Sequence, residues 1–204
     1  MFQGKMKAVT FSYDDGVTQD LNMIRILDKY GLKATFNLNS ELLGTDSCLK
    51  WNGVTVSTSR AKPEWVKTWY ANHEVAVHTL THPRLPEITD DAEVIRQVEK
   101  DRLNLSELVG YEVVGMAYPC GGVNNDERVA KLIREHTGVK YARTITSNES
   151  FEPQTNLFQF NPTFWHRDYD RMYELAEQFL SMNAETPQIF YIWGHSYEFD
   201  LFGT

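Results

Sequence analysis

The stretch KAVTFSYDDGVTQDLNMIRILDKYGLKATFNLN, residues 7–39, decides the fold because it holds two strands joined by a helix. Its opening, KAVTFSY, is rich in β-branched and aromatic residues, which are typical of a buried strand. The next segment, residues 18–31, is predicted to be a helix with Thr18 as its N-cap and Gly31 as its C-terminal stop. Because LKATFNLN (32–39) follows as a strand, the helical crossover predicts parallel pairing of the two strands.

The same alternation of strand and helix continues to the end of the chain. Strands are predicted at 74–79, 112–119, 139–144 and 187–195, helices at 63–73, 88–110, 125–138 and 169–184, and loops at 44–62 and 145–168. Repeated units of this kind indicate an α/β fold, either a barrel or an open doubly wound sheet. Neither a repeat nor a linker divides the 204 residues, so we expect a single domain over residues 1–204.

Composition and charge exclude several classes of function. The net charge of −8 and the pI of about 5.2 argue against nucleic-acid binding, which needs a basic face. No run of 18 apolar residues is present, so no membrane span is expected. The N-terminal residues lead into a strand with no room for a signal peptide, which predicts a cytoplasmic protein. Cys48 and Cys120 are expected to be free thiols.

Polar residues gather where the predicted strands end. In parallel α/β folds, chemistry takes place at the carboxyl ends of the strands, which meet on one rim. The residues found at those ends are Asp14, Asp15, Asn37, Asn39, His78, His82, Arg143 and His195, together with the backbone around Cys120. Two carboxylates and three histidines are therefore expected to converge on one rim.

The segment HTLTH, residues 78–82, places two histidines four residues apart at a strand end. Two imidazoles and one carboxylate form a common catalytic metal site with open positions. Of two adjacent aspartates, one can bind a metal while the other transfers protons beside it, and the cation offsets their repulsion. The alternatives are that the histidines are a solvated or hydrogen-bonded pair, and that an aspartate only caps the next helix or closes the turn at Gly16.

Four segments together resemble the polysaccharide deacetylase family, which is the NodB-homology domain of carbohydrate esterase family four. They are FSYDDG (11–16), HTLTH, AYPCGG (117–122) and IWGH (192–195), in the order and approximate spacing of that family over about residues 7–199. The resemblance implies an irregular (β/α)7-type barrel with parallel strands. Because the chain stops nine residues after His195, we expect a barrel that is incomplete at the C-terminus or closed by a partner subunit.

The resemblance also implies a cofactor and a substrate. Asp15, His78 and His82 resemble the metal triad of the family, whose cation is most often zinc, with cobalt, nickel or manganese as alternatives. Family members remove N-acetyl groups from amino sugars or O-acetyl groups from xylan. The expected partner is therefore an acetylated saccharide.

Catalytic roles follow from the same positions. Asp14 resembles the catalytic base that takes a proton from the attacking water, and His195 resembles the general acid that protonates the leaving group. By position, the backbone N–H of Cys120 would stabilise the oxyanion, together with the metal.

The third motif departs from the family pattern. Ala117 stands where the family has an arginine that orients the catalytic aspartate, and Cys120 stands where it has a tyrosine. Arg143, at the end of the next strand, could supply the missing guanidinium to Asp14, although it could equally be a surface arginine.

The Asp-Trp element of the family has no clear counterpart here. Trp165 is a candidate wall of the substrate pocket, and Tyr118 is a second candidate substrate contact. His166 is expected to be structural or a substrate contact, and Trp193 to lie in the core or the pocket wall. Glu198 could orient a side chain or a sugar hydroxyl, but an exposed turn is the favoured interpretation.

Two further hypotheses remain beside the saccharide deacetylase. One is an amide hydrolase that acts on a non-sugar substrate. The other is a carbohydrate- or metal-binding homologue with an impaired site, which the missing arginine and the short C-terminus favour. Retention of all five of Asp14, Asp15, His78, His82 and His195 argues against the impaired site.

Overall fold

A computed structural model describes residues 2–203, and its centre is one curled sheet of seven parallel strands. The strand order across the sheet is β7-β6-β5-β2-β1-β9-β8. The strands are β1 (Lys7–Asp14), β2 (Ala34–Leu38), β5 (Glu74–Val77), β6 (Gly115–Ala117), β7 (Tyr141–Arg143), β8 (Phe164–Trp165) and β9 (Gln188–Gly194). The predicted α/β fold with an irregular parallel barrel is confirmed.

The first strand lies in the middle of this sheet. β1 pairs in parallel with β2, where Asp14 lies opposite Asn37, and with β9, where Tyr13 lies opposite Gly194. This pairing confirms the β-α-β unit predicted for residues 7–39. Strands with neighbours on both sides need apolar residues on both faces, and all five residues of β2 are accordingly buried.

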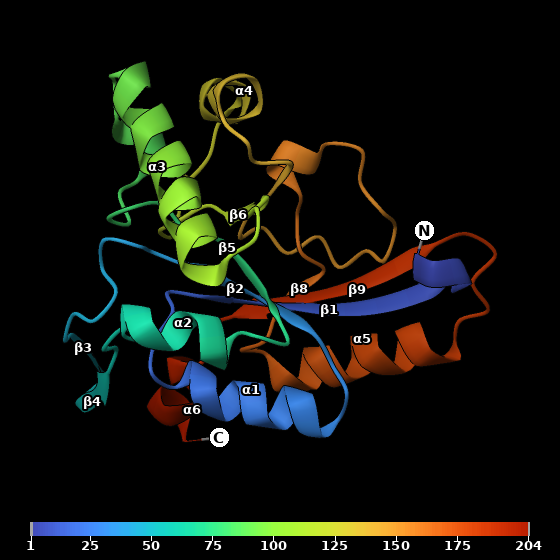
Figure 1. Cartoon of the computed structure of the whole chain (residues 1–204). Coiled ribbons are helices and arrows are strands. Elements are labelled where there is room, and N and C mark those ends of the chain that lie inside the picture. The colour runs from blue at the N-terminus through green and yellow to red at the C-terminus, as the bar shows by residue number, and fades with distance from the viewer. Residues whose placement is uncertain (1, 204) are drawn as a thin grey trace.

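Helices flank the sheet on both sides, as Figure 1 shows. α3 and α4 lie above the long strands β1 and β9 in that view, and α1, α2, α5 and α6 lie below them. Their bounds are α1 (Asp20–Lys29), α2 (Pro63–Trp69), α3 (Asp91–Val109), α4 (Glu127–His136), α5 (Tyr169–Ser181) and α6 (Tyr197–Phe202). None of the helices within residues 2–203 is long and apolar enough to cross a bilayer.

The start of α1 differs from the prediction. Gln19, not Thr18, is the N-cap residue, and it caps with no side-chain hydrogen bond because its backbone is already helical. The predicted stop is confirmed: the helix ends at Lys29, and Gly31 adopts φ = +66°, a left-handed conformation that glycine reaches without strain.

Both segments expected to be loops contain regular structure. β3 (Cys48–Trp51) and β4 (Val54–Ser57) form an antiparallel hairpin that stands apart from the main sheet. The second segment contains the 3₁₀ turn η3 (Leu157–Gln159) and the two-residue strand β8. Strands this short carry too few residues for a recognisable alternation of apolar and polar positions.

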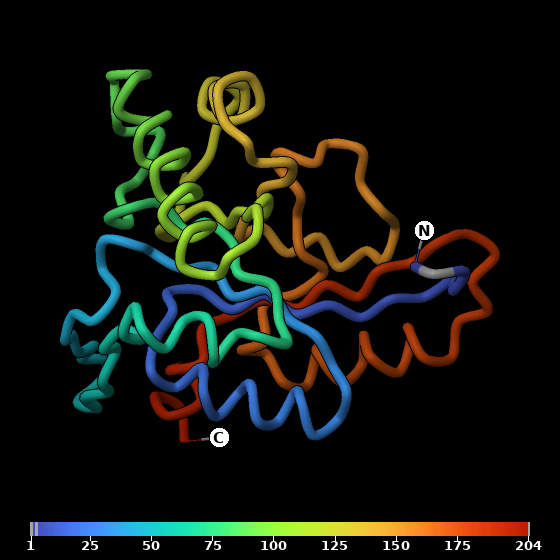
Figure 2. The backbone as a smooth tube through the Cα atoms, in the orientation of Figure 1, coloured from blue at the N-terminus to red at the C-terminus, as the bar shows by residue number. Residues whose placement is uncertain are grey.

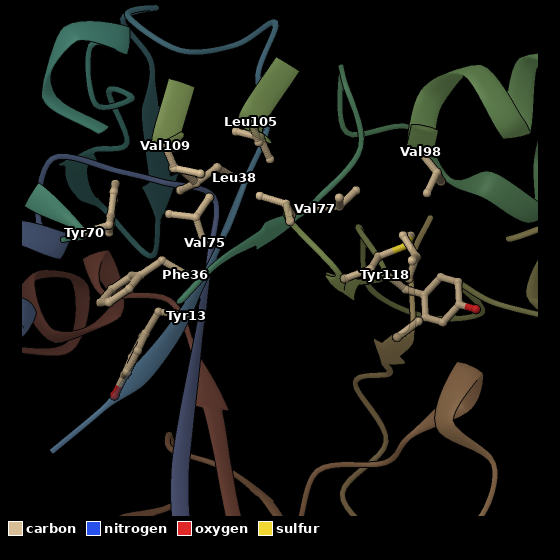
Figure 3. Close-up of a cluster of buried hydrophobic side chains, with 14 of the residues drawn as sticks. Tyr13, Phe36, Leu38, Tyr70, Val75, Val77, Val98, Leu105, Val109 and Tyr118 are labelled. Atoms are coloured by element: carbon tan, nitrogen blue, oxygen red, sulfur yellow. The ribbon is translucent and has the colours of Figure 1, made fainter. Parts of the chain in front are cut away.

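Buried hydrophobic side chains form two clusters. The larger one joins strands β1, β2 and β5 to α1, α3 and α4, and Figure 3 shows part of it, including Phe36, Val77 and Leu105. The smaller one packs α5 against β8 and β9 through residues such as Leu175, Phe179 and Phe190. Helices on both faces therefore pack against the sheet, and the strands carrying the polar residues at their ends are held from both sides.

The barrel is incomplete, but its opening lies between β7 and β8 rather than at the last strand. β9 is paired on both sides, with β1 and with β8. A single backbone bridge from Arg143 to Phe160 links β7 to the segment that then becomes β8. The backbone trace in Figure 2 also shows that the start of β1 lies beside the start of β9, consistent with Lys7 opposite Gln188.

Candidate active site

The two aspartates follow one another where β1 turns into the next loop. Asp14 is the last residue of β1, and both carboxylates are almost fully buried, with 2% and 8% of each residue exposed. Asp15 has φ = +85°, an uncommon conformation for a residue with a side chain. This left-handed turn sends consecutive side chains to different partners, so the two carboxylates do not compete for one position.

Asp14 is held by two donors on one oxygen. Its Oδ1 accepts a hydrogen bond of 2.8 Å from Nδ2 of Asn37 and a second one from Nη2 of Arg143. Burial raises the pKa of Asp14, but Arg143, His78 and His195 together outweigh that effect, and the pKa lies below its usual value. Asp14 is therefore ionised at neutral pH, and Oδ2 is the oxygen left for a proton.

Arg143 is a buried residue and not a surface arginine. No part of it is exposed, and its guanidinium also donates to Ser12 Oγ (3.1 Å) and to the carbonyl of Thr144 (2.9 Å). It stacks over the ring of Trp193 at 4.7 Å. The structure thus brings Arg143, at the end of the edge strand β7, across the strand ends to Asp14 at the end of β1.

Asp15, His78 and His82 form a compact cluster. Oδ1 of Asp15 lies 3.8 Å from Nε2 of His78 and 3.5 Å from Nε2 of His82, and one ligand atom from each residue lies within 4.8 Å of the others. Nδ1 of His78 is 2.9 Å from the carbonyl of Ala117, which can only accept, so Nδ1 carries the proton and Nε2 has a free lone pair. Burial lowers the pKa of His78 to about 4, which keeps the ring neutral.

The residues present fit a divalent transition metal. Oδ1 of Asp15 is buried and accepts no hydrogen bond from any residue between 2 and 203, although Nη1 of Arg60 lies 3.0 Å away. Arg60 offsets part of the charge, but this buried oxygen also faces the Nε2 atoms of His78 and His82, and a bound cation would satisfy all three atoms. Two nitrogens and one oxygen are also the donor set of many catalytic zinc sites.

Arg60 is a site residue that the sequence analysis missed. It follows β4, pairs with Val17 through an isolated bridge, and donates to the backbone carbonyl of Asp15 as well as lying beside its carboxylate. Burial raises the pKa of Asp15, but Arg60 and the nearby histidines hold it well below its usual range. A lone arginine in a stretch expected to be a loop carries no signal that would have identified it.

His195 follows β9 and faces the same centre. Its Nε2 lies 4.0 Å from Oδ2 of Asp15, and its Nδ1 lies 3.2 Å from Oε2 of Glu198. Burial lowers the pKa of His195, but Glu198 and Asp15 outweigh that effect and raise it to about 9. The ring is therefore protonated at neutral pH, as a general acid must be.

Glu198 is buried, so the expectation of an exposed turn was wrong. α6 begins two residues after His195 and turns Glu198 inward, where only 5% of it is exposed. Its Oε2 accepts from the backbone N–H of His195 (3.0 Å) and from Nε1 of Trp165 (3.2 Å), and it lies 2.8 Å from Nε2 of His166. The spacing of three residues from His195 is the sequence signal that could have identified it.

The loop after β6 carries Cys120 to the rim. Cys120 has φ = +70°, and among residues 2–203 its backbone N–H has no acceptor. Asn124, fully buried, fixes this loop by donating to the carbonyls of Tyr118 (3.2 Å) and Cys120 (2.9 Å). Left-handed residues with side chains store strain that the surroundings must hold, and they concentrate at functional sites.

These side chains surround one cavity of about 490 Å³. It is lined by Asp14, Asp15, His78, His82, Cys120, Gly121, Gly122, Ile145, Trp165, Trp193, His195 and Tyr197. Trp165 and Trp193 stack with ring centroids 5.5 Å apart and form an aromatic wall. Seven of the nine residues predicted for the site therefore line this cavity, and Arg143 lies behind Asp14.

Tyr118 does not reach the cavity, so its expected contact with substrate is not supported. It has no exposed surface, and its hydroxyl donates to the carbonyl of Phe158 at 2.7 Å. Figure 3 shows it within the larger hydrophobic cluster. It lies in a short segment between β6 and the rim, where the alternation of sides along the chain turns the ring inward.

Comparisons with known proteins agree with this geometry. The sequence profile of the family described as polysaccharide deacetylase matches residues 3–142. No curated protein sequence matches the chain.

Solved structures with a similar fold include the Streptococcus pyogenes deacetylase PplD in complex with acetate, at 18% identity and a TM-score of 0.59, covering 74% of this chain and 61% of that one. IcaB from Ammonifex degensii is 19% identical with a TM-score of 0.54, and the match covers 65% of this chain and 57% of that one. The family 4 carbohydrate esterase from Streptomyces lividans in complex with acetate is 13% identical with a TM-score of 0.57, and the match covers 93% of this chain and 79% of that one. The match thus spans about three fifths of the first two structures.

Proposed function

Because this chain belongs to the polysaccharide deacetylase family, we propose that it hydrolyses acetyl groups of a saccharide in a metal-dependent reaction. The observation that carries the proposal is the convergence of an ionised Asp14, a protonated His195 and the cluster of Asp15, His78 and His82 on one cavity. Two of the similar structures are complexes with acetate, the product of such a reaction.

Asp15, His78 and His82 would hold the cation. A divalent metal at this position would polarise the acetyl carbonyl and lower the pKa of water. Zinc suits the two imidazoles and one carboxylate, and cobalt, nickel or manganese are alternatives.

The chain's own residues supply the proton transfers. Oδ2 of Asp14 accepts a proton from the attacking water, while Arg143 and Asn37 hold the other oxygen. The backbone N–H of Cys120 would donate a hydrogen bond to the oxyanion, a contribution on the order of 3 kcal/mol in comparable sites. His195 then gives its proton to the leaving amine or alkoxide, and Glu198 fixes the ring. Trp165 forms the wall against which the substrate packs.

Acetate release from a panel of substrates tests the proposal. The panel contains N-acetylated oligosaccharides, acetylated xylan and small non-sugar amides, each with chelator-treated protein and with zinc, cobalt, nickel or manganese restored. Release from a saccharide that requires metal and is lost in Asp14→Asn supports the proposal. Release from the amides alone would favour the non-sugar amide hydrolase. No release from folded protein that still binds metal would favour a binding homologue.

Cytoplasmic location and association through the C-terminal end stay predictions. Fractionation of the source cells tests the first, and sedimentation velocity at several protein concentrations tests the second.

A further inference from the structure

We propose that a polar cleft beside the catalytic cavity is a second saccharide-binding subsite, which holds sugar units next to the acetylated one. This inference rests on the proposed function and extends it to substrate length. The cleft has a volume of about 570 Å³. It is lined by Asn125, Thr144, Thr146, Pro153, Gln154, Thr155, Asn156, Gln159 and Asn161, and we call it the amide cleft.

The chemistry of the amide cleft selects a neutral polyol. Its lining consists of five carboxamides, three threonines and one proline, with no charged side chain. Carboxamides and hydroxyls both donate and accept hydrogen bonds, as the hydroxyl groups of a sugar require. An anionic ligand would instead be met by lysine or arginine, and an apolar one by aliphatic walls.

The carboxamides are already oriented by hydrogen bonds to one another. Asn156 donates to Gln159 (3.1 Å), Gln159 donates to Asn125 (3.0 Å), and Asn125 donates to Asn124 (2.9 Å). A primary amide has two N–H donors and two acceptor lone pairs, so each central amide retains one of each for a ligand. Side chains fixed before binding lose less conformational entropy when the ligand arrives.

A single segment of backbone, residues 144–146, separates the amide cleft from the catalytic cavity. Thr144 and Thr146 line the cleft, whereas Ile145 between them lines the catalytic cavity. The amide chain also ends at Asn124, which holds the carbonyl of Cys120 at the rim. Most of the lining comes from the long segment between β7 and β8, whose backbone is gold to orange in Figure 2. A saccharide with its acetyl group at Asp14 would therefore reach the cleft across Ile145.

Two isosteric substitutions test this inference. Thr146 and Thr155 are exposed threonines on the lining, so valine removes the hydroxyl and keeps the shape. The measurement is the ratio of kcat/KM for the N-acetylglucosamine pentamer to kcat/KM for the monomer. Loss of two hydrogen bonds should lower this ratio about tenfold in Thr146→Val/Thr155→Val. The matched control, Thr68→Val on an exposed face of α2, should leave it at the wild-type value.

A ratio equal to that of the wild type, in a variant with the wild-type circular dichroism spectrum and Tm, would overturn the inference. Failure of the proposed function is recognised separately, because then no panel member releases acetate at all. In that case pentamer binding to Asp14→Asn is measured by calorimetry with and without the two valines. About tenfold weaker binding supports the subsite, and unchanged or undetectable binding refutes it.

Discussion

Replacing Arg143 with methionine should expose how strongly the base depends on its buried partner. The substitution removes the only guanidinium that contacts Asp14 among residues 2–203, together with the bonds to Ser12 and the Thr144 carbonyl. It leaves the Asp14 carboxylate buried with the single donor Asn37. Breaking one side of a buried ion pair destabilises a protein by about 3–5 kcal/mol, so we expect a loss of that size in the free energy of unfolding.

A double-mutant cycle separates this charge effect from lost packing. In Arg143→Met/Asp14→Asn both members are neutral, so the double variant should be more stable than the sum of the single losses predicts. Coupling of about 1–3 kcal/mol is expected for groups in direct contact. Urea unfolding of chelator-treated protein at pH 7.5 gives the four values, free of any stabilisation by bound metal. Lowering the pH toward protonation of Asp14 should shrink the cost of Arg143→Met.

Arg171→Met is the control, because Arg171 pairs with Glu149 and Glu174 on the surface. Exposed pairs contribute about 0–1 kcal/mol, so little change is expected there. A cost below about 1 kcal/mol for Arg143→Met, or a fully additive cycle, would refute the reasoning that Asp14 is kept ionised by Arg143.

Three further predictions follow from the site and its surroundings. Glu198→Gln should lower the pKa of His195 from about 9, since it removes the first of the groups that raise it, and the basic limb of the kcat/KM profile should move to lower pH; an unmoved limb would exclude Glu198 as its partner. Asp20, buried against Tyr70 and Ser196, has its pKa raised by burial to about 7, so the protonated form favours the fold and stability falls as pH rises from about 4 to 7. This fall in the free energy of unfolding is on the order of 4 kcal/mol, and Asp20→Asn should lack it. Urea unfolding of both proteins at pH 5 and pH 8 measures the fall, and a fall of equal size in the wild type and in Asp20→Asn would contradict the prediction. His82→Ala should weaken zinc binding at least tenfold by calorimetry, whereas His136→Ala on α4 should not; equal affinity would place the metal elsewhere.

The sequence by itself determined the parts that depend on local pattern. Apolar runs followed by helical spacing predicted parallel strands, and the rule that the ends of such strands meet at one rim predicted that Asp14, His78 and His195 lie close together. The rule also placed Arg143 on the same rim as Asp14, because β7 pairs in parallel with β6, where Arg143 lies opposite Ala117, the position at which the family has its arginine. These inferences succeed since they rest on the order and direction of strands, which the chain itself encodes.

Tertiary structure alone decided which side chains the rim residues meet. Glu198 turns inward because α6 packs behind His195, and Arg60 reaches Asp15 from a hairpin with no pattern of its own. Tyr118 turns away from the rim into the core, although its neighbour Cys120 faces the cavity. Contacts of this kind depend on packing between segments far apart in sequence, where burial and charge override local propensity. The strand ends were therefore readable from the sequence, whereas the partners that set the pKa of His195 and hold Asp15 required the folded chain.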